Sequence, residues 1–143
     1  MFTKQVTILL ENKKGRLAEV TKLLADERIN IRAMSLADMA DLGVLRLIVN
    51  DRQRCLSALR ARGLVAQETD VIAVEIEDQP GGLHRVVQVF EREEINIEYM
   101  YAFVEKNDAN AIVVFKINDA ARAVETLKKD GISILREDFL QNL

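Results

Sequence analysis

Short apolar runs and helical apolar spacing alternate along the first half of the chain. Residues 5–10 form a short β-rich run, which is typical of a buried strand. After a turn at residues 12–15, apolar side chains recur every three or four positions, with charged residues between them. This spacing predicts an amphipathic helix that ends near Arg28. The apolar positions of this helix are Leu17, Val20, Leu23 and Leu24.

A hairpin and a second helix follow. Residues 31–39 and 44–49 predict two strands joined by a short turn. Residues 50–51 (Asn-Asp) supply a helix cap, and Gly63 ends the helix that the cap begins. Because residues 64–68 predict one more strand, the order is strand, helix, strand, strand, helix, strand.

The second half of the chain repeats the first. Residues 14–20 (KGRLAEV) return as residues 80–86 (PGGLHRV), and residues 29–34 (INIRAM) return as residues 95–100 (INIEYM), without a gap between the segments. Further along, the cap residues Asn50 and Asp51 return as Asn118 and Asp119, and Gly63 returns as Gly131. The offset between these pairs is two residues larger than in the earlier segments, which predicts an insertion at a hairpin tip in residues 106–110. A repeat of this kind indicates a duplicated structural unit.

The repeated order predicts an α+β protein made of two ferredoxin-like units. In this β-α-β-β-α-β plan, two helices cover one face of a four-stranded antiparallel sheet. We expect domain 1 in residues 1–69 and domain 2 in residues 70–143, joined side by side, with residues 66–70 as the connection. The residues expected in the two cores are Leu45, Leu47 and Val49, then Val113, Phe115 and Ile117. We expect Met34 and Met100 to fill gaps in the cores, and the alternative is that they line a ligand pocket.

Composition and charge narrow the function classes. The net charge of −3 argues against nucleic acid as a partner, because such binding depends on Lys and Arg. The predicted third strands also carry no exposed aromatic residue on which RNA bases could stack. Cys55 is the only cysteine, so it makes no internal disulfide, and it is read as a small buried hydrophobe. With no signal peptide and no apolar stretch of membrane-spanning length, we expect a cytoplasmic protein that does not enter a membrane.

Catalysis has little support in the sequence. The only histidine, His84, lies in the first turn of a predicted helix, and no Cys, Ser or second His is placed to act with it. No spacing of His, Cys and carboxylate residues suggests a metal site. Residues 80–82 are too short to form a phosphate-binding glycine loop. We therefore expect a protein that is not an enzyme and that needs no metal or cofactor.

The repeated turn is the stronger candidate for a site. Residues 11–17 lead from a strand into a helix N-terminus, whose unpaired N–H groups attract carboxylates. Gly15 allows close approach of the backbone, and Asn12 and Asn30 offer amides that suit both an ammonium and a carboxylate. The alternative is that the glycine only makes the turn and the asparagines satisfy nearby backbone groups. Because Asn30 returns as Asn96, we favour a ligand site.

These segments resemble those of ACT domains, which are small regulatory modules that bind amino acids. The resemblance spans essentially the whole chain and is strongest in residues 11–17 with 30–31, and in residues 78–83 with 96–97. Both regions are similar to the serine-binding segments in the regulatory domain of phosphoglycerate dehydrogenase. The layout also resembles stand-alone tandem ACT proteins that are associated with phenylacetate–CoA ligase-type enzymes.

The resemblance implies a non-catalytic sensor whose partners are an amino acid effector, a regulated enzyme and a second copy in a homodimer. The alternative is a ligand-independent assembly module for a partner enzyme. In the family, effectors bind at the seam between ACT units, where the glycine loop of one meets the second strand of the other. Carried over, the implied ligand-binding residues are Asn12, Gly15, Arg16 and Leu17 with Asn96 and Ile97, and Asp78, Gly81, Gly82 and Leu83 with Asn30 and Ile31.

The two sites are not expected to be equal. Asp78 stands where the first unit has Asn12, so its carboxylate would accept from an ammonium but repel a carboxylate. We therefore expect the Asn12 site to bind an amino acid more tightly than the Asp78 site.

Overall fold

The computed structural model describes residues 2–103 and 110–143, and its contacts divide the chain into two units. The first unit is Lys4–Thr69, and the second is Asp70–Gln141 together with residues 2–3. The insertion predicted at residues 106–110 lies outside the described residues, except for Asn110.

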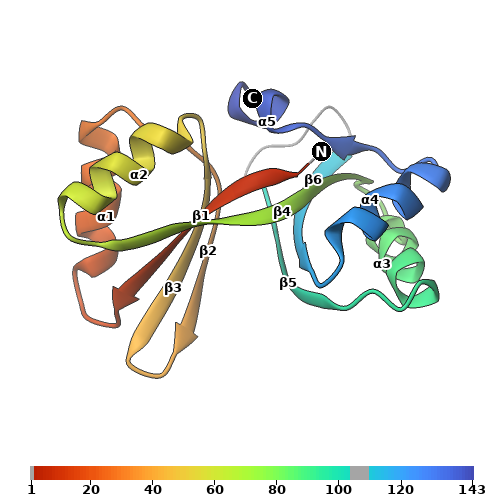
Figure 1. Ribbon diagram of the computed structural model, residues 1–143, viewed down its shortest axis with the longest axis horizontal. Coiled ribbons are helices and arrows are strands. Elements are labelled where there is room, and N and C mark those ends of the chain that lie inside the picture. The colour runs from red at the N-terminus through yellow and green to blue at the C-terminus, as the bar shows by residue number, and fades with distance from the viewer. Residues whose placement is uncertain (1, 104–109) are drawn as a thin grey trace. The chain divides into compact units, whose positions relative to one another are not determined.

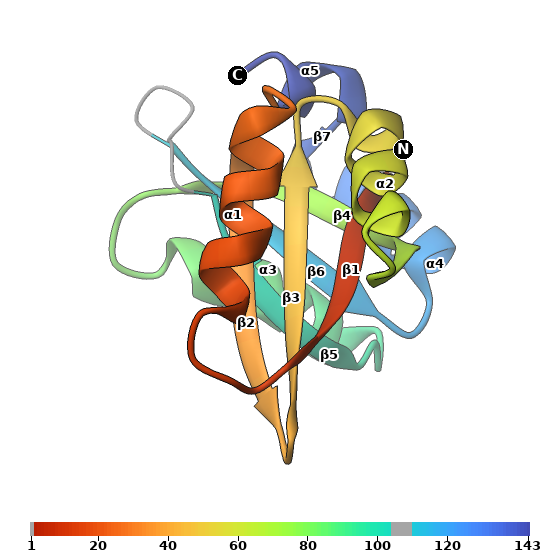
Figure 2. The ribbon, with the colours of Figure 1, turned by 90° about the vertical axis from the view of Figure 1, so that its left-hand side faces the viewer.

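The first unit has the predicted β-α-β-β-α-β order. Its strands lie in the order β2-β3-β1-β4, with antiparallel pairing of β1 to β3 and of β2 to β3. Helices α1 and α2 cover the same face of these strands (Figure 1 and Figure 2). The elements are β1 (Thr3–Glu11), α1 (Arg16–Asp26), β2 (Ile31–Met39), β3 (Leu42–Val49), α2 (Arg52–Ala61) and the first part of β4 (Val65–Glu77).

The second unit repeats this plan. Its strands lie in the order β7-β4-β6-β5, again with antiparallel pairs, and α3 and α4 lie on one face of them (Figure 1). The ferredoxin-like prediction is therefore confirmed for both units. The elements after β4 are α3 (Gly82–Arg92), β5 (Ile97–Ala102), β6 (Asn110–Ile117), α4 (Ala120–Lys129), β7 (Ile134–Leu135) and α5 (Glu137–Gln141).

The strand shared by the two units differs from the prediction. The sequence predicts two strands with residues 66–70 as a connection, whereas β4 runs without a break from Val65 to Glu77. Its middle is polar but contains no Gly or Pro that would end a strand. The hydroxyl groups of Thr69 and Thr7 lie 2.9 Å apart, so this polar stretch is also bonded to β1.

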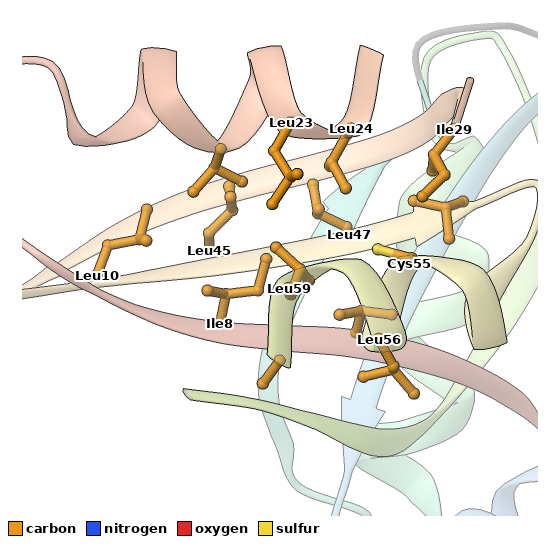
Figure 3. Close-up of a cluster of buried hydrophobic side chains, with 14 residues drawn as sticks. Ile8, Leu10, Leu23, Leu24, Ile29, Leu45, Leu47, Cys55, Leu56 and Leu59 are labelled. Atoms are coloured by element: carbon orange, nitrogen blue, oxygen red, sulfur yellow. The ribbon is translucent and has the colours of Figure 1, made fainter. Parts of the chain in front are cut away.

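Each unit has its own core between its helices and its strands. In the first, Leu23 and Leu24 of α1 lie over Leu45 and Leu47 of β3, and Leu59 of α2 completes the cluster (Figure 3). In the second, the rings of Phe90 in α3 and Phe115 in β6 meet edge to face with centroids 5.2 Å apart. All of the core residues predicted in β3 and β6 are buried, which confirms that part of the prediction.

The prediction that Met34 and Met100 fill the cores is wrong. Their side chains are 37% and 38% exposed. They lie on β2 and β5, the outermost strands of their units, where the helices do not cover them fully. The sequence pattern could not show which strands would be outermost.

Helix caps follow the prediction closely. Asp51 begins α2 and accepts a hydrogen bond from the Arg54 amide, and Asp119 begins α4 and accepts one from the Arg122 amide. Gly63 follows α2 with a φ of 74°. Within residues 2–103 and 110–143, no helix is long and apolar enough to cross a membrane, and no group of three or more His, Cys, Asp or Glu is placed to hold a metal ion.

Burial makes the Cys55 thiol unreactive. The side chain lies in the first core, and desolvation, with a smaller effect from the Asp51 carboxylate, raises the pKa of the thiol to about 11. Because the thiolate is the reactive form, we expect the native protein to resist iodoacetamide at mildly alkaline pH and the urea-unfolded protein to react fully. Mass spectrometry measures the modified fraction, and rapid labelling of the native protein would contradict this placement.

Candidate functional site

The two glycine turns have the same left-handed backbone. Gly15 precedes α1 with a φ of 91°, and Gly81 precedes α3 with a φ of 87°. Any other residue would be strained in this conformation. Among the residues that the structure describes, no atom outside the turn lies within 4 Å of the position that a Cβ would take at either glycine. Both turns are therefore held by backbone conformation, and the space beside them is open.

The helices that follow these turns start without a side-chain cap. No capping side chain is found at the N-terminus of α1 or α3 in the described part of the chain, whereas Asp51 and Asp119 cap α2 and α4. The first amides of α1 and α3 bond within their turns, Arg16 to the Lys13 carbonyl and Gly82 to the Gln79 carbonyl. The amides that come next have no intrahelical partner, so each helix offers N–H groups to an anion.

Asn12 is held against the hairpin of β2 and β3. Its backbone N–H donates to the Asp41 carbonyl at 2.9 Å, and its side-chain Nδ2 lies 3.5 Å from Asp38 Oδ1. Asp38 was not predicted from the sequence as a neighbour of the turn. The pairing register of the strands explains its position. In β3, Leu42 pairs with Glu11 of β1, and the next residue, Gly43, pairs with Asp38 of β2, so Asp38 lies near the end of β1.

The charges around the two turns differ. Near the first, the Lys13 Nζ lies 2.8 Å and the Arg16 Nη2 lies 3.8 Å from Glu11 Oε2, and these cations lower the pKa of the Glu11 carboxyl group. Lys14 adds one more positive charge. The second turn has Glu77 in the place of Glu11, adds the negative charge of Asp78, and has no Lys or Arg in residues 77–84. The first turn therefore suits a carboxylate better than the second.

Asn30 and Asn96 are fixed through their backbones, while their side chains are exposed. The amide of Asn30 donates to Asn50 Oδ1 at 2.8 Å, and its carbonyl accepts from the Asn50 amide. Asn96 and Asn118 make the same pair of bonds, with the side-chain bond at 2.9 Å. Asn50 and Asn118 were read from the sequence only as part of helix caps. The pair Asn30 and Asn50 recurs in the second half as Asn96 and Asn118, and this repetition could have indicated that the two asparagines of each pair bond to each other.

The predicted residues of one unit do not meet within that unit. Asn12 lies before α1 and Asn30 lies after it, and an eleven-residue helix is about 16 Å long. A site that uses both kinds of asparagine must therefore take them from different units or copies. The pairing of Asn12 with Asn96 and of Asp78 with Asn30 stays a prediction.

Several of the other predicted residues also have structural roles. Leu17 and Ile31 pack partly buried against the first core, and Ile97 does the same in the second. Arg16 Nη1 donates to the Glu19 carboxylate at 3.0 Å. Leu83, in contrast, is 42% exposed beside the second turn, so its side chain is accessible to a ligand.

Gly82 is required by close approach of two backbones. A Cβ at this position would lie 2.0 Å from the Glu77 carbonyl oxygen. We expect Gly82→Ala to lower the free energy of unfolding by roughly 1–3 kcal/mol, the usual cost of overpacking. Gly43→Ala is the control, because its nearest contact, at 3.4 Å, is the flexible Leu36 side chain. Equal urea midpoints for the two variants would contradict this explanation.

The bonds of Asn50 predict a difference between two neighbouring asparagines. Asn50→Ala removes the acceptor for the Asn30 amide, so it should lower the free energy of unfolding by about 1 kcal/mol. Asn30→Ala removes an exposed side chain and should change the free energy by less than about 0.5 kcal/mol. Urea unfolding measures both. A larger loss for Asn30→Ala would mean that its side chain has a structural role.

Comparison with known proteins places this geometry in a family. The family described as an ACT domain pair matches residues 1–143. The crystal structure of protein BT0572 from Bacteroides thetaiotaomicron is 38% identical, with a TM-score of 0.93, over 100% of this chain and 98% of that one. No protein of curated function matches the chain.

More distant structures share the fold. The ligand-free regulatory subunit of aspartate kinase from Thermus thermophilus is 17% identical, with a TM-score of 0.63, over 88% of this chain and 90% of that one. The corresponding subunit from Thermus flavus is 19% identical, with a TM-score of 0.60 and the same shares of the two chains. The duplicated fold, the two left-handed glycine turns and the match over the full sequence agree: the chain belongs to the ACT-domain family, as a tandem pair of ACT domains.

Proposed function

We propose that this protein is a non-catalytic sensor that binds an amino acid and thereby regulates a partner enzyme. The observation that carries the proposal is the uncapped helix N-terminus behind a left-handed glycine, which occurs in both units. A zwitterionic ligand needs donors for its carboxylate and acceptors for its ammonium group. The first turn offers both.

The donors are the amides at the start of α1, in a loop made positive by Lys13, Lys14 and Arg16. The acceptors are Asp38 and the side-chain oxygen of Asn12. The distance of 3.5 Å between Asn12 and Asp38 is long for a hydrogen bond, so a ligand ammonium gives up little by replacing that contact. Asn96 is proposed to complete this site. Asn30 is proposed to complete the corresponding site at the second turn.

Regulation would follow from linkage. A ligand shifts an equilibrium between two arrangements only by the difference in its affinity for them. Among proteins of this fold, the aspartate kinase subunits are named as regulatory subunits. By analogy, this chain would act on a separate enzyme in the cytoplasm.

A homodimer is part of the proposal. The edge strand β2 presents Met34 and Leu36, which are 37% and 53% exposed. An apolar outer strand with unpaired backbone groups favours pairing with another strand. A second copy of the chain supplies a matching edge.

An assembly role without a ligand is the second candidate, and the second turn favours it. Asp78 places a negative charge where the first unit has the neutral Asn12, and no Lys or Arg of residues 77–84 offsets it. For this unit the ACT surface would serve for contact with a partner protein.

The test is a thermal-shift screen against the natural amino acids, with calorimetry on each ligand that raises the melting temperature. We expect a ligand whose tighter binding weakens by about tenfold in Asn12→Ala, which corresponds to about 1.4 kcal/mol of lost interaction. Asp78→Ala is the matched variant and should leave the tighter binding unchanged. An Asn12→Ala isotherm equal to that of the wild type would rule out this site. If no amino acid raises the melting temperature, the assembly module is favoured.

A further inference from the structure

A groove in the first unit borders the Asn12 turn and shares Glu11 and Arg16 with it, but Asn12 itself does not line it. It is formed by the end of β1, one side of α1 and the turn between α2 and β4, and its volume is about 530 Å³. Sites for small molecules commonly have volumes of about 300–1,000 Å³. We propose that this groove binds a monocarboxylate with an apolar body, at a site that adjoins the proposed amino-acid site but is not lined by Asn12.

Exposed apolar side chains gather in this groove. Leu9, Leu42 and Val65 line it and are 38%, 42% and 60% exposed. Leu10 and Leu23, which belong to the core, also reach its lining. Exposed apolar residues that converge on one concavity, rather than being scattered, mark a binding site.

The second unit provides an internal comparison. A groove lies at the same place in its fold, but Glu75, Asn110 and Ser133 stand where the first unit has Leu9, Leu42 and Val65. Asn110 Nδ2 donates to Glu75 Oε1 at 2.5 Å, so two of these polar side chains bond to each other across it. The fold alone therefore does not require apolar residues at these positions. The first unit has acquired, or kept, an apolar groove that its duplicate lacks.

The charge at the rim identifies the ligand class. Arg62 lines the groove, and no hydrogen bond or ion pair of its side chain is found among the described residues. The matching residue of the second unit is Asp130, whose carboxylate already accepts from Arg92 at 3.1 and 3.2 Å. A guanidinium binds a carboxylate through two parallel hydrogen bonds. Arg62 is thus placed to hold the head group of a ligand whose apolar part lies over Leu42 and Val65.

The other charged residues of the rim limit the ligand to one negative charge. Arg16 lines the groove too, but it is bound to Glu19 at 3.0 Å and lies 3.8 Å from Glu11. Glu11 and Glu19 face the groove with their own negative charges, which disfavour a second carboxylate. A monocarboxylate fits this balance better than a dicarboxylate or a phosphate ester.

Calorimetry of the full chain with octanoate tests the proposal. We expect saturable binding of octanoate, with clearly weaker binding of octanol, which lacks the charge, and of acetate, which lacks the apolar body. Arg62→Gln should weaken octanoate binding by about tenfold, as expected for loss of a charged hydrogen-bond partner. Arg54→Gln is the matched control, because it removes an exposed arginine of α2, the helix that Arg62 follows, outside the groove.

A second variant tests the apolar part. Leu42→Asn combined with Val65→Ser copies the residues of the second unit, and both positions are exposed, so a thermal melt should show an intact fold. This variant should lose octanoate binding. Asn12→Ala should keep it while weakening amino-acid binding, which separates failure of this inference from failure of the proposed function.

The proposal is overturned if octanoate does not bind at millimolar concentration, or if octanol binds equally well. An unchanged affinity in Arg62→Gln would also overturn it. Loss of octanoate binding in Asn12→Ala would show that the ligand occupies the turn rather than the groove.

Discussion

The packing of α1 and α2 against the strands is the interaction on which the first unit depends. Leu24 and Leu59 are almost fully buried between the helices and Leu47 of β3. Burial of such side chains is the main favourable term in folding. It also fixes the axis of α1, so the amides at the start of this helix point to one defined place. The candidate site therefore depends on a core whose residues touch no ligand.

The two units share the residues that set the backbone but differ in side chains around the turns and grooves. The left-handed glycines, the capping aspartates and the asparagines that bind the start of β2 and β5 occur in both units. These features determine the backbone. The residues that differ, such as exposed Asn12 against exposed Asp78 or exposed Arg62 against half-buried Asp130, leave the backbone unchanged. Two copies of one fold can in this way present two different surfaces to ligands or partners.

Much of the fold could be predicted because it depends on local patterns. The strand at residues 31–39 coincides with β2, and the caps at Asp51 and Asp119 were evident from their position before apolar periodicity. The continuous β4 was missed because its polar middle resembles a linker, whereas pairing with a neighbouring strand stabilises it. The positions of Met34 and Met100 were wrong for a related reason, since strand order decides which strands are left at an edge.

For the candidate site, the sequence by itself determined the glycine turns, the helix that follows each of them and the exchange of Asn12 for Asp78. These are consequences of backbone preference and residue identity at single positions. Only the tertiary structure decided that Asp38 lies beside Asn12 and that Asn50 accepts from the Asn30 amide. It also decided that one groove is lined by Leu9, Leu42, Arg62 and Val65. The bonds of Asn12 to Asp38 and of Asn30 to Asn50 join residues 26 and 20 positions apart. Their distances follow from strand pairing and helix packing, which no local pattern contains.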